Sequence, residues 1–195
     1  MNVTSPVQVN QTLIPGLFDE IVRSHVIPLL CHACVYWPGR LISHAWQLAM
    51  EASIETLFLP ISVDCSSLLV RLTHLHELNL GLGDGDYTPV LAQLTHLRTL
   101  HLGVNSYDYT TVLGQLTHLR TLHLGGNSHD YTTALGQLTH LHALYLNYNS
   151  YDHTTVLSQL THLRTLDLGW NNHDYTVVLG QLTHLRVLTL GRERV

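Results

Sequence analysis

The sequence predicts an α/β solenoid, an arc with short parallel strands on its concave face and a small helical module before it. Two observations lead to this prediction. The phrase Leu-Thr-His-Leu recurs at a period of 22 residues, and within each repeat the leucines keep the spacing L-x-x-L-x-L. The phrase begins at Leu72, Leu94, Leu116, Leu138, Leu160 and Leu182.

The strand of each repeat is predicted at the alternating leucines. In one repeat, Leu100 and Leu102 are expected to face the core, whereas Thr99, His101 and Gly103 are expected to face outward. One repeat buries too few side chains to offset the conformational entropy of its ordered residues, so the repeats must stack on one another.

Each strand is expected to end in a turn that leads to a short helix. Asparagine follows the strand at positions 105, 127, 149 and 171, where its side chain is expected to bond backbone groups inside the coil. The run DYTTVLGQL then offers Asp or Thr as the cap of one or two helical turns. A fainter unit near residues 54–59 raises the expected number of strands to about seven.

This pattern resembles the leucine-rich repeat family, particularly its short 22-residue intracellular and internalin-like classes. The resemblance covers about residues 54–190, and Gly83 and Glu193 depart from the pattern because they stand where Asn is expected. It implies an arc that binds a protein ligand. A weaker likeness to the FNIP repeat lies in L-T-H-L-x-x-L, although the Phe-Asn-x-Pro signature of that repeat is absent.

Two outward columns vary between repeats while the leucines stay constant. Tyr, Trp and Arg gather toward the C-terminal half of these columns, and these residue types dominate binding hot spots. We therefore predict a protein-binding surface on the concave face; drift of unpacked positions is the alternative. The predicted partner-binding residues are His101, His123, Tyr145, Tyr148, Asp167, Trp170 and Arg192.

Histidine also recurs once per repeat, and neighbours in this row are expected about 5 Å apart. We interpret the row as structural, through stacking and hydrogen bonding, because metal ligands converge on a point whereas a row spreads along a line. Weak metal binding by His101 and His123, and acid sensing by the row, are the alternatives. The row comprises His74, His96, His118, His140, His162 and His184.

A row of arginines is predicted beside the strands, as a solvated edge or as a site for an acidic segment of a partner. The net charge is -5, and all nine basic residues are Arg. This balance does not predict nucleic-acid binding. The row comprises Arg98, Arg120, Arg164 and Arg186, interrupted by His76 and His142.

The first 50 residues lack the repeat. They contain Ile14, Pro15, Leu17, Ile21 and Trp46, and this pattern resembles an F-box. The resemblance implies docking on a linker subunit, and a role as substrate receptor of a cullin-RING ubiquitin ligase. A helical cap over the first coil is the alternative. The domains expected are a flexible N-terminus at 1–13, an F-box-like or capping module at 14–52 and the solenoid at 53–195.

No phosphate-binding loop, zinc-protease motif or nucleophile elbow occurs, so we predict no enzyme, no cofactor and no metal. Cys31, Cys34 and Cys65 are expected to be thiols. Without a signal peptide or a long apolar stretch, a cytoplasmic location and no membrane association are expected. The leading prediction is a protein-protein interaction module; a scaffold without a ubiquitin role, or a His-rich metal-binding or pH-sensing protein, remain open.

Overall fold

The computed structural model of the protein describes residues 55–58, 69–80, 85–104, 107–126, 129–171 and 173–191. All of them belong to the second of the two units into which the chain divides, Pro38–Val195. The predicted N-terminus at 1–13, the F-box-like or capping module at 14–52 and the three cysteines lie outside the described residues.

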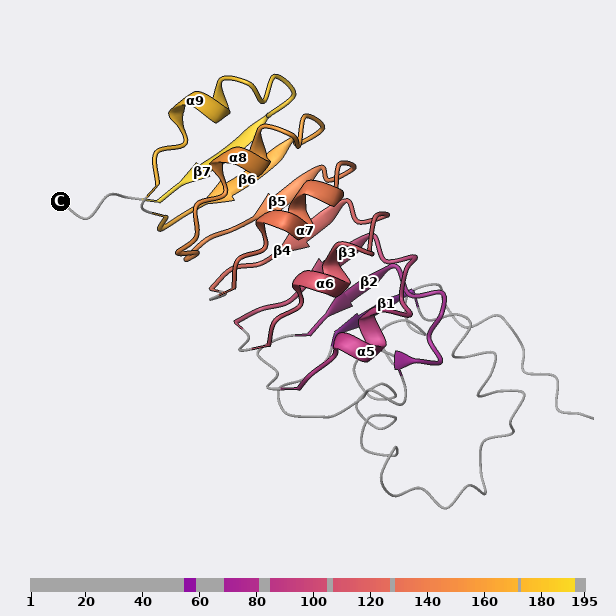
Figure 1. Ribbon diagram of the computed structural model, residues 1–195. Helices are drawn as coiled ribbons and strands as arrows, with labels where there is room; N and C mark the ends of the chain where they lie inside the picture. Colours follow the sequence, from indigo (N-terminus) through magenta and orange to yellow (C-terminus); the bar gives the residue numbers. More distant parts are fainter. Residues whose placement is uncertain are drawn as a thin grey trace, which may run out of the picture. The chain divides into compact units, whose positions relative to one another are not determined.

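The described strands form one parallel sheet in chain order, as Figure 1 shows. Leu100 lies opposite Leu122, and Leu122 lies opposite Leu144, so each rung repeats the one before it. This register follows from the constant 22-residue period and confirms the predicted α/β solenoid. The strands are β1 (Thr56–Phe58), β2 (Glu77–Asn79), β3 (Thr99–His101), β4 (Thr121–His123), β5 (Ala143–Tyr145), β6 (Thr165–Leu168) and β7 (Val187–Leu190).

From β2 onward, a short helix lies between successive strands, on one side of the sheet (Figure 1). The helices span four residues each, except α7, which spans six. Within the described ranges, no helix has the length and hydrophobicity that crossing a membrane requires. The helices are α5 (Thr88–Leu91), α6 (Thr110–Leu113), α7 (Thr132–Gln137), α8 (Thr154–Leu157) and α9 (Thr176–Leu179).

An aspartate, called here the helix-start aspartate, lies two residues before the first residue of each helix. In α7, the Thr132 backbone N–H donates to Oδ1 of Asp130 at 2.9 Å. The equivalent bonds in the other four coils measure 2.8 to 2.9 Å. Together with the threonine hydroxyl, this bond lowers the pKa of the Asp130 carboxyl. The N-cap position of each helix is instead Tyr or His and makes no side-chain cap bond, so the predicted Asp or Thr cap is wrong. The Asp side chain forms a turn with the backbone two residues on.

The core consists of the predicted leucines. Leu100, Leu122 and Leu144 are fully buried, because each has a coil on both sides. The equivalent Leu188 in β7 is 39% exposed, and Leu190 is 59% exposed. Burial in this fold therefore depends on a following coil, as stacking of repeats requires.

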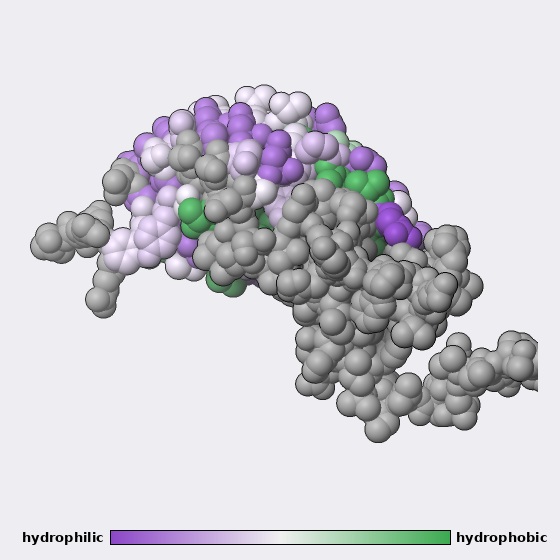
Figure 2. Space-filling model, turned by 90° about the horizontal axis from the view of Figure 1, so that it is seen from below, coloured by the Kyte–Doolittle hydropathy of each residue, from purple (hydrophilic) through white to green (hydrophobic). Residues whose placement is uncertain are grey.

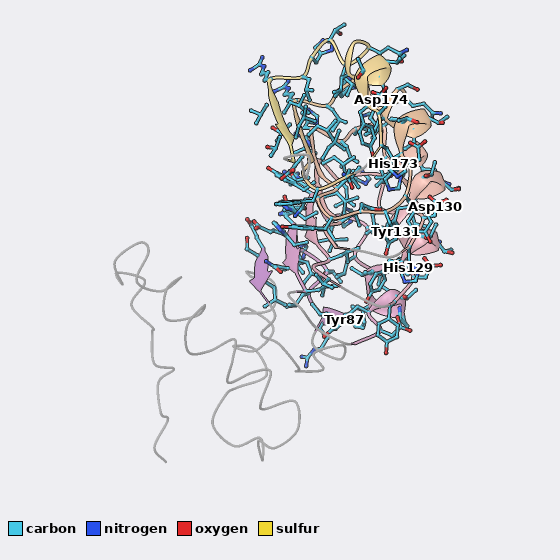
Figure 3. The ribbon with its side chains drawn as sticks, turned by 90° about the vertical axis from the view of Figure 1, so that its left-hand side faces the viewer. Tyr87, His129, Asp130, Tyr131, His173 and Asp174 are labelled. Carbon is cyan, nitrogen blue, oxygen red and sulfur yellow. The ribbon has the colours of Figure 1, made fainter. Side chains whose placement is uncertain are left out.

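A column of aromatic residues beside the leucines was not predicted as core. The residue after each helix-start aspartate is buried, whereas the sequence pattern indicated only turn and cap chemistry. The Tyr109 hydroxyl donates to the Gly85 carbonyl at 3.0 Å and so links two coils. Figure 3 shows Tyr87 and Tyr131 on the helix side of the sheet. The column comprises Tyr87, Tyr109, Tyr131, His153 and Tyr175.

The asparagines after β5 and β6 bond the backbone as predicted. Nδ2 of Asn171 donates to the Leu146 carbonyl at 3.1 Å, and its Oδ1 accepts from the Asn149 N–H at 3.0 Å. Oδ1 of Asn149 accepts from the Tyr151 N–H at 3.1 Å. These bonds satisfy backbone groups that leave the sheet at each turn.

Candidate functional site

Three stacked rings lie on the outward face of the strands, called here the strand face. The His101 and His123 rings are 3.8 Å apart between centroids, with 17° between their planes. The His123 and Tyr145 rings are also 3.8 Å apart, with 5° between their planes. All three are half-buried, and they face outward as predicted. The in-register pairing of β3, β4 and β5 stacks them, because it aligns equivalent side chains.

The stack determines the charge of its histidines. Burial, with a smaller effect of the neighbouring His101, lowers the pKa of His123 to about 4. Burial also lowers the pKa of His101, although Glu77 acts in the opposite direction. The strand face therefore presents neutral rings at neutral pH.

A metal site on these histidines finds no support in their geometry. Parallel stacked imidazoles direct their nitrogens side by side, whereas metal ligands converge on one point. In the ranges that the structure describes, no group of three or more His, Cys, Asp or Glu side chains is placed to hold a metal ion.

A second aromatic group follows the strands. Tyr148 and Trp170 are 59% and 47% exposed, and their rings are nearly parallel, with 5.7 Å between centroids and 9° between planes. Both backbones are left-handed, with φ of 58° for Tyr148 and 63° for Trp170. The equivalent position two coils before Trp170 is Gly126, with φ of 71°. Tyr148 and Trp170 are called the left-handed pair below.

Asp167 follows Tyr145 in the outward column that contains His101 and His123. Asp167 and Tyr145 lie opposite each other in the sheet. Its Oδ1 accepts the Gly169 N–H at 2.8 Å, which fixes the carboxylate beside the turn. The structure therefore brings six of the seven predicted partner-binding residues onto the strand face and its rim. The seventh, Arg192, lies outside the described residues.

The predicted stacking of the histidine row is wrong. His96 and His118 are 6.2 Å apart and tilted by 54°, and His140 and His162 are 6.4 Å apart and tilted by 64°. These four side chains are exposed, so no neighbouring group forces their rings to be parallel. Parallel stacking occurs instead in the column of His101, where the rings are half-buried.

Sequence reasoning missed the left-handed backbone of Tyr148 and Trp170. The signal available was Gly126 in the same column, because glycine is the residue that most readily adopts positive φ. On the face seen in Figure 2, hydrophilic residues cover most of the described surface, and hydrophobic areas are limited.

Comparisons with known proteins identify the fold. No family model matches the chain, and no curated protein matches it. The FNIP and F-box likenesses therefore stay predictions from the sequence.

Solved structures do match. Internalin C2 of Listeria monocytogenes is 26% identical, with a TM-score of 0.54, over 65% of this chain and 56% of that one. Internalin F of the same species is 28% identical, with a TM-score of 0.51, over 71% of this chain and 47% of that one. A leucine-rich repeat protein of Leptospira interrogans is 23% identical, with a TM-score of 0.56, over 77% and 46% of the two chains, and shows the fold alone. The matches span about half the length of these structures.

Proposed function

We propose that this chain, which has the leucine-rich repeat fold of the structures it resembles, is a scaffold that binds a protein partner on its strand face. The left-handed pair forms the centre of the binding surface. The stack of His101, His123 and Tyr145 forms a second, flatter area beside it.

The observation that carries the proposal is the conformation of Tyr148 and Trp170. A left-handed backbone is unfavourable for residues other than glycine, by about 1–2 kcal/mol each. The fold tolerates glycine there, as Gly126 demonstrates. Large aromatic rings at such positions, 47% and 59% exposed, contribute little to the core. Selection for binding explains why they are present, since Tyr and Trp supply large contact areas at hot spots.

The stack of rings supports the same surface. His123 is held between two rings, and His101 and Tyr145 each stack on it, so fewer rotamers remain to be lost when a partner binds. The rings are neutral at neutral pH because of the lowered pKa values of the two histidines. The surface therefore suits an apolar or hydrogen-bonding side chain of a partner.

The test is affinity capture of partners with the full chain, followed by hydrogen exchange on the captured complex. The double variant Tyr148→Gly and Trp170→Gly is expected to lose the partner. Its free energy of unfolding is expected to stay within about 1 kcal/mol of the parent, because relief of backbone strain offsets the loss of stacking.

The matched control is Val104→Gly, which truncates an exposed side chain in the same column, and it is expected to keep the partner. Protection of the strand-face rim around residues 145–148 and 167–170 supports the proposal. A partner that the double variant retains, or that protects the helix side instead, contradicts it.

A finer proposal, that the protein is a substrate receptor of a cullin-RING ubiquitin ligase, is supported by the sequence at Ile14, Pro15, Leu17, Ile21 and Trp46. These residues lie outside the described ranges. We expect the parent to co-precipitate with the linker subunit and the Leu17→Asp variant not to do so. The double glycine variant is the control, and it is expected to keep the linker. If the parent does not bind the linker, the ubiquitin role is wrong and the scaffold proposal stands unaffected.

A further inference from the structure

A row of basic residues directly precedes strands β2 to β7, and is called here the entry rim. From the second member onward, each backbone N–H in the row donates to the carbonyl of the preceding member at 2.8 Å. The side chains are therefore anchored on successive rungs, about 4.8 Å apart. The members are His76, Arg98, Arg120, His142, Arg164 and Arg186.

The four arginines of the entry rim are exposed. Within the described part of the chain, none of them has an ion-pair partner. At the β1–β2 end of the row, Glu55 directly precedes β1 and Glu77 is the first residue of β2. Farther along the strand face, Asp167 accepts the Gly169 N–H. The four arginines of the rim thus form no ion pairs with the described carboxylates.

Adjacent rungs place like charges side by side. Arg98 neighbours Arg120, and Arg164 neighbours Arg186, with His142 between the two pairs. Like charges on neighbouring strands repel each other, and the repulsion is relieved when an anion lies between them. Guanidinium groups bind carboxylates through two parallel hydrogen bonds, which makes a carboxylate a fitting anion.

We propose that the entry rim from Arg98 to Arg186 binds an extended acidic segment of a protein partner, which runs across the coils. Four rung spacings cover roughly 19 Å, and alternate side chains of an extended peptide repeat about every 6.7 Å. About four carboxylates on one side of such a segment thus match the four arginines. The proposal deepens the proposed function, because it assigns part of the same partner to a different surface.

Charge on the rest of the molecule favours a peptide over a nucleic acid. A row of exposed aspartates lies at the helix starts, on the helix side of the sheet, where Figure 3 labels Asp130 and Asp174. The chain as a whole carries a net charge of -5. A long polyanion that reaches beyond the single row meets these carboxylates, whereas a short acidic segment does not.

The test measures binding of a fluorescein-labelled poly-glutamate peptide to the full chain by fluorescence anisotropy. Two double variants, Arg98→Gln with Arg120→Gln and Arg164→Gln with Arg186→Gln, are each expected to weaken binding about fivefold or more at low salt. Combining all four substitutions is expected to abolish it. Replacement of the four arginines by Lys is expected to restore part of the affinity, because the charge remains.

The matched control is Thr111→Glu with Thr133→Glu, which makes the same change in net charge at exposed helix positions. This control and the double glycine variant of the left-handed pair are both expected to keep peptide binding within about twofold. The proposal is wrong if the parent does not bind the peptide, if the control weakens binding as much as the Gln variants, or if oligothymidylate binds more tightly. These outcomes do not affect the proposed aromatic binding surface. If the double glycine variant still binds the partner, the aromatic surface is wrong and the entry-rim proposal is not affected.

Discussion

The His123 imidazole lies flat against the Tyr145 ring, with 3.8 Å between centroids and 5° between planes. Its other face is covered by His101 at the same centroid distance. Burial between these rings lowers the pKa of His123 to about 4. The stack therefore holds the neutral imidazole, and protonation of His123 opposes the folded state.

The first prediction concerns pH. The unfolded imidazole titrates near 6.5, so at lower pH the unfolded chain binds more protons than the folded one. Stability thus rises with pH in this window: the contribution of His123 is fully present above about 6.5 and is lost as pH falls toward about 4. Because the ring is half-exposed, we expect a loss of about 1–2 kcal/mol. Urea unfolding at a series of pH values measures it.

His123→Tyr is the control for this prediction, since a tyrosine continues the stack without titrating in the window. Its unfolding free energy is expected to depend less steeply on pH than that of the parent. Equal slopes for the two proteins show that the stack does not carry the effect.

The second prediction concerns His153, which replaces tyrosine in the buried aromatic column. Its Nδ1 lies 3.1 Å from the Thr132 hydroxyl, but its buried Nε2 has no hydrogen-bond partner among the described residues. His153→Phe removes this group and is expected to stabilise the protein by about 1 kcal/mol at neutral pH. The gain is expected to grow at about pH 5, because burial lowers the pKa of His153. Thermal unfolding of the parent and of His153→Phe at neutral pH and at about pH 5 measures this gain. A less stable variant at both pH values contradicts the prediction.

The third prediction concerns the helix starts. Asp130→Ala removes the acceptor of the Thr132 N–H and is expected to lower stability by about 1 kcal/mol at neutral pH. Asp130→Asn keeps an acceptor oxygen and is expected to lose less than half of that. Because the pKa of Asp130 is lowered in the fold, its contribution is present above about pH 4 and lost below it. The deficit of the alanine variant should therefore shrink in acid, and a constant deficit argues against the carboxylate.

The fourth prediction compares equivalent leucines in two coils. Leu144 is fully buried, whereas Leu188 is 39% exposed. Leu144→Ala is expected to lower the unfolding free energy by about 2.7–5 kcal/mol, because it leaves a cavity between two coils. Leu188→Ala is expected to lower it by less than about 1.5 kcal/mol. Denaturant midpoints measure both, and a similar loss for the two shows that another chain segment covers β7.

Much of the site was predictable because its columns follow from the repeat. His101, His123, Tyr145 and Asp167 occupy one outward column in the sequence, and the structure keeps them in one column. The histidine row shows the limit of this reasoning. His96 and His118 form as regular a column as His101 and His123, yet they do not stack.

The sequence alone determined the rung-by-rung register, the inward leucines and the outward columns. Repeats of equal length that pair in parallel place equivalent residues opposite each other. Only the tertiary structure decided which rings stack, which aromatic residues are buried and which backbones are left-handed. These properties depend on how closely side chains of neighbouring coils are packed and on how each turn leaves the sheet. The neutral His123 and the exposed Tyr148 and Trp170 result from that packing, which the repeat pattern does not predict.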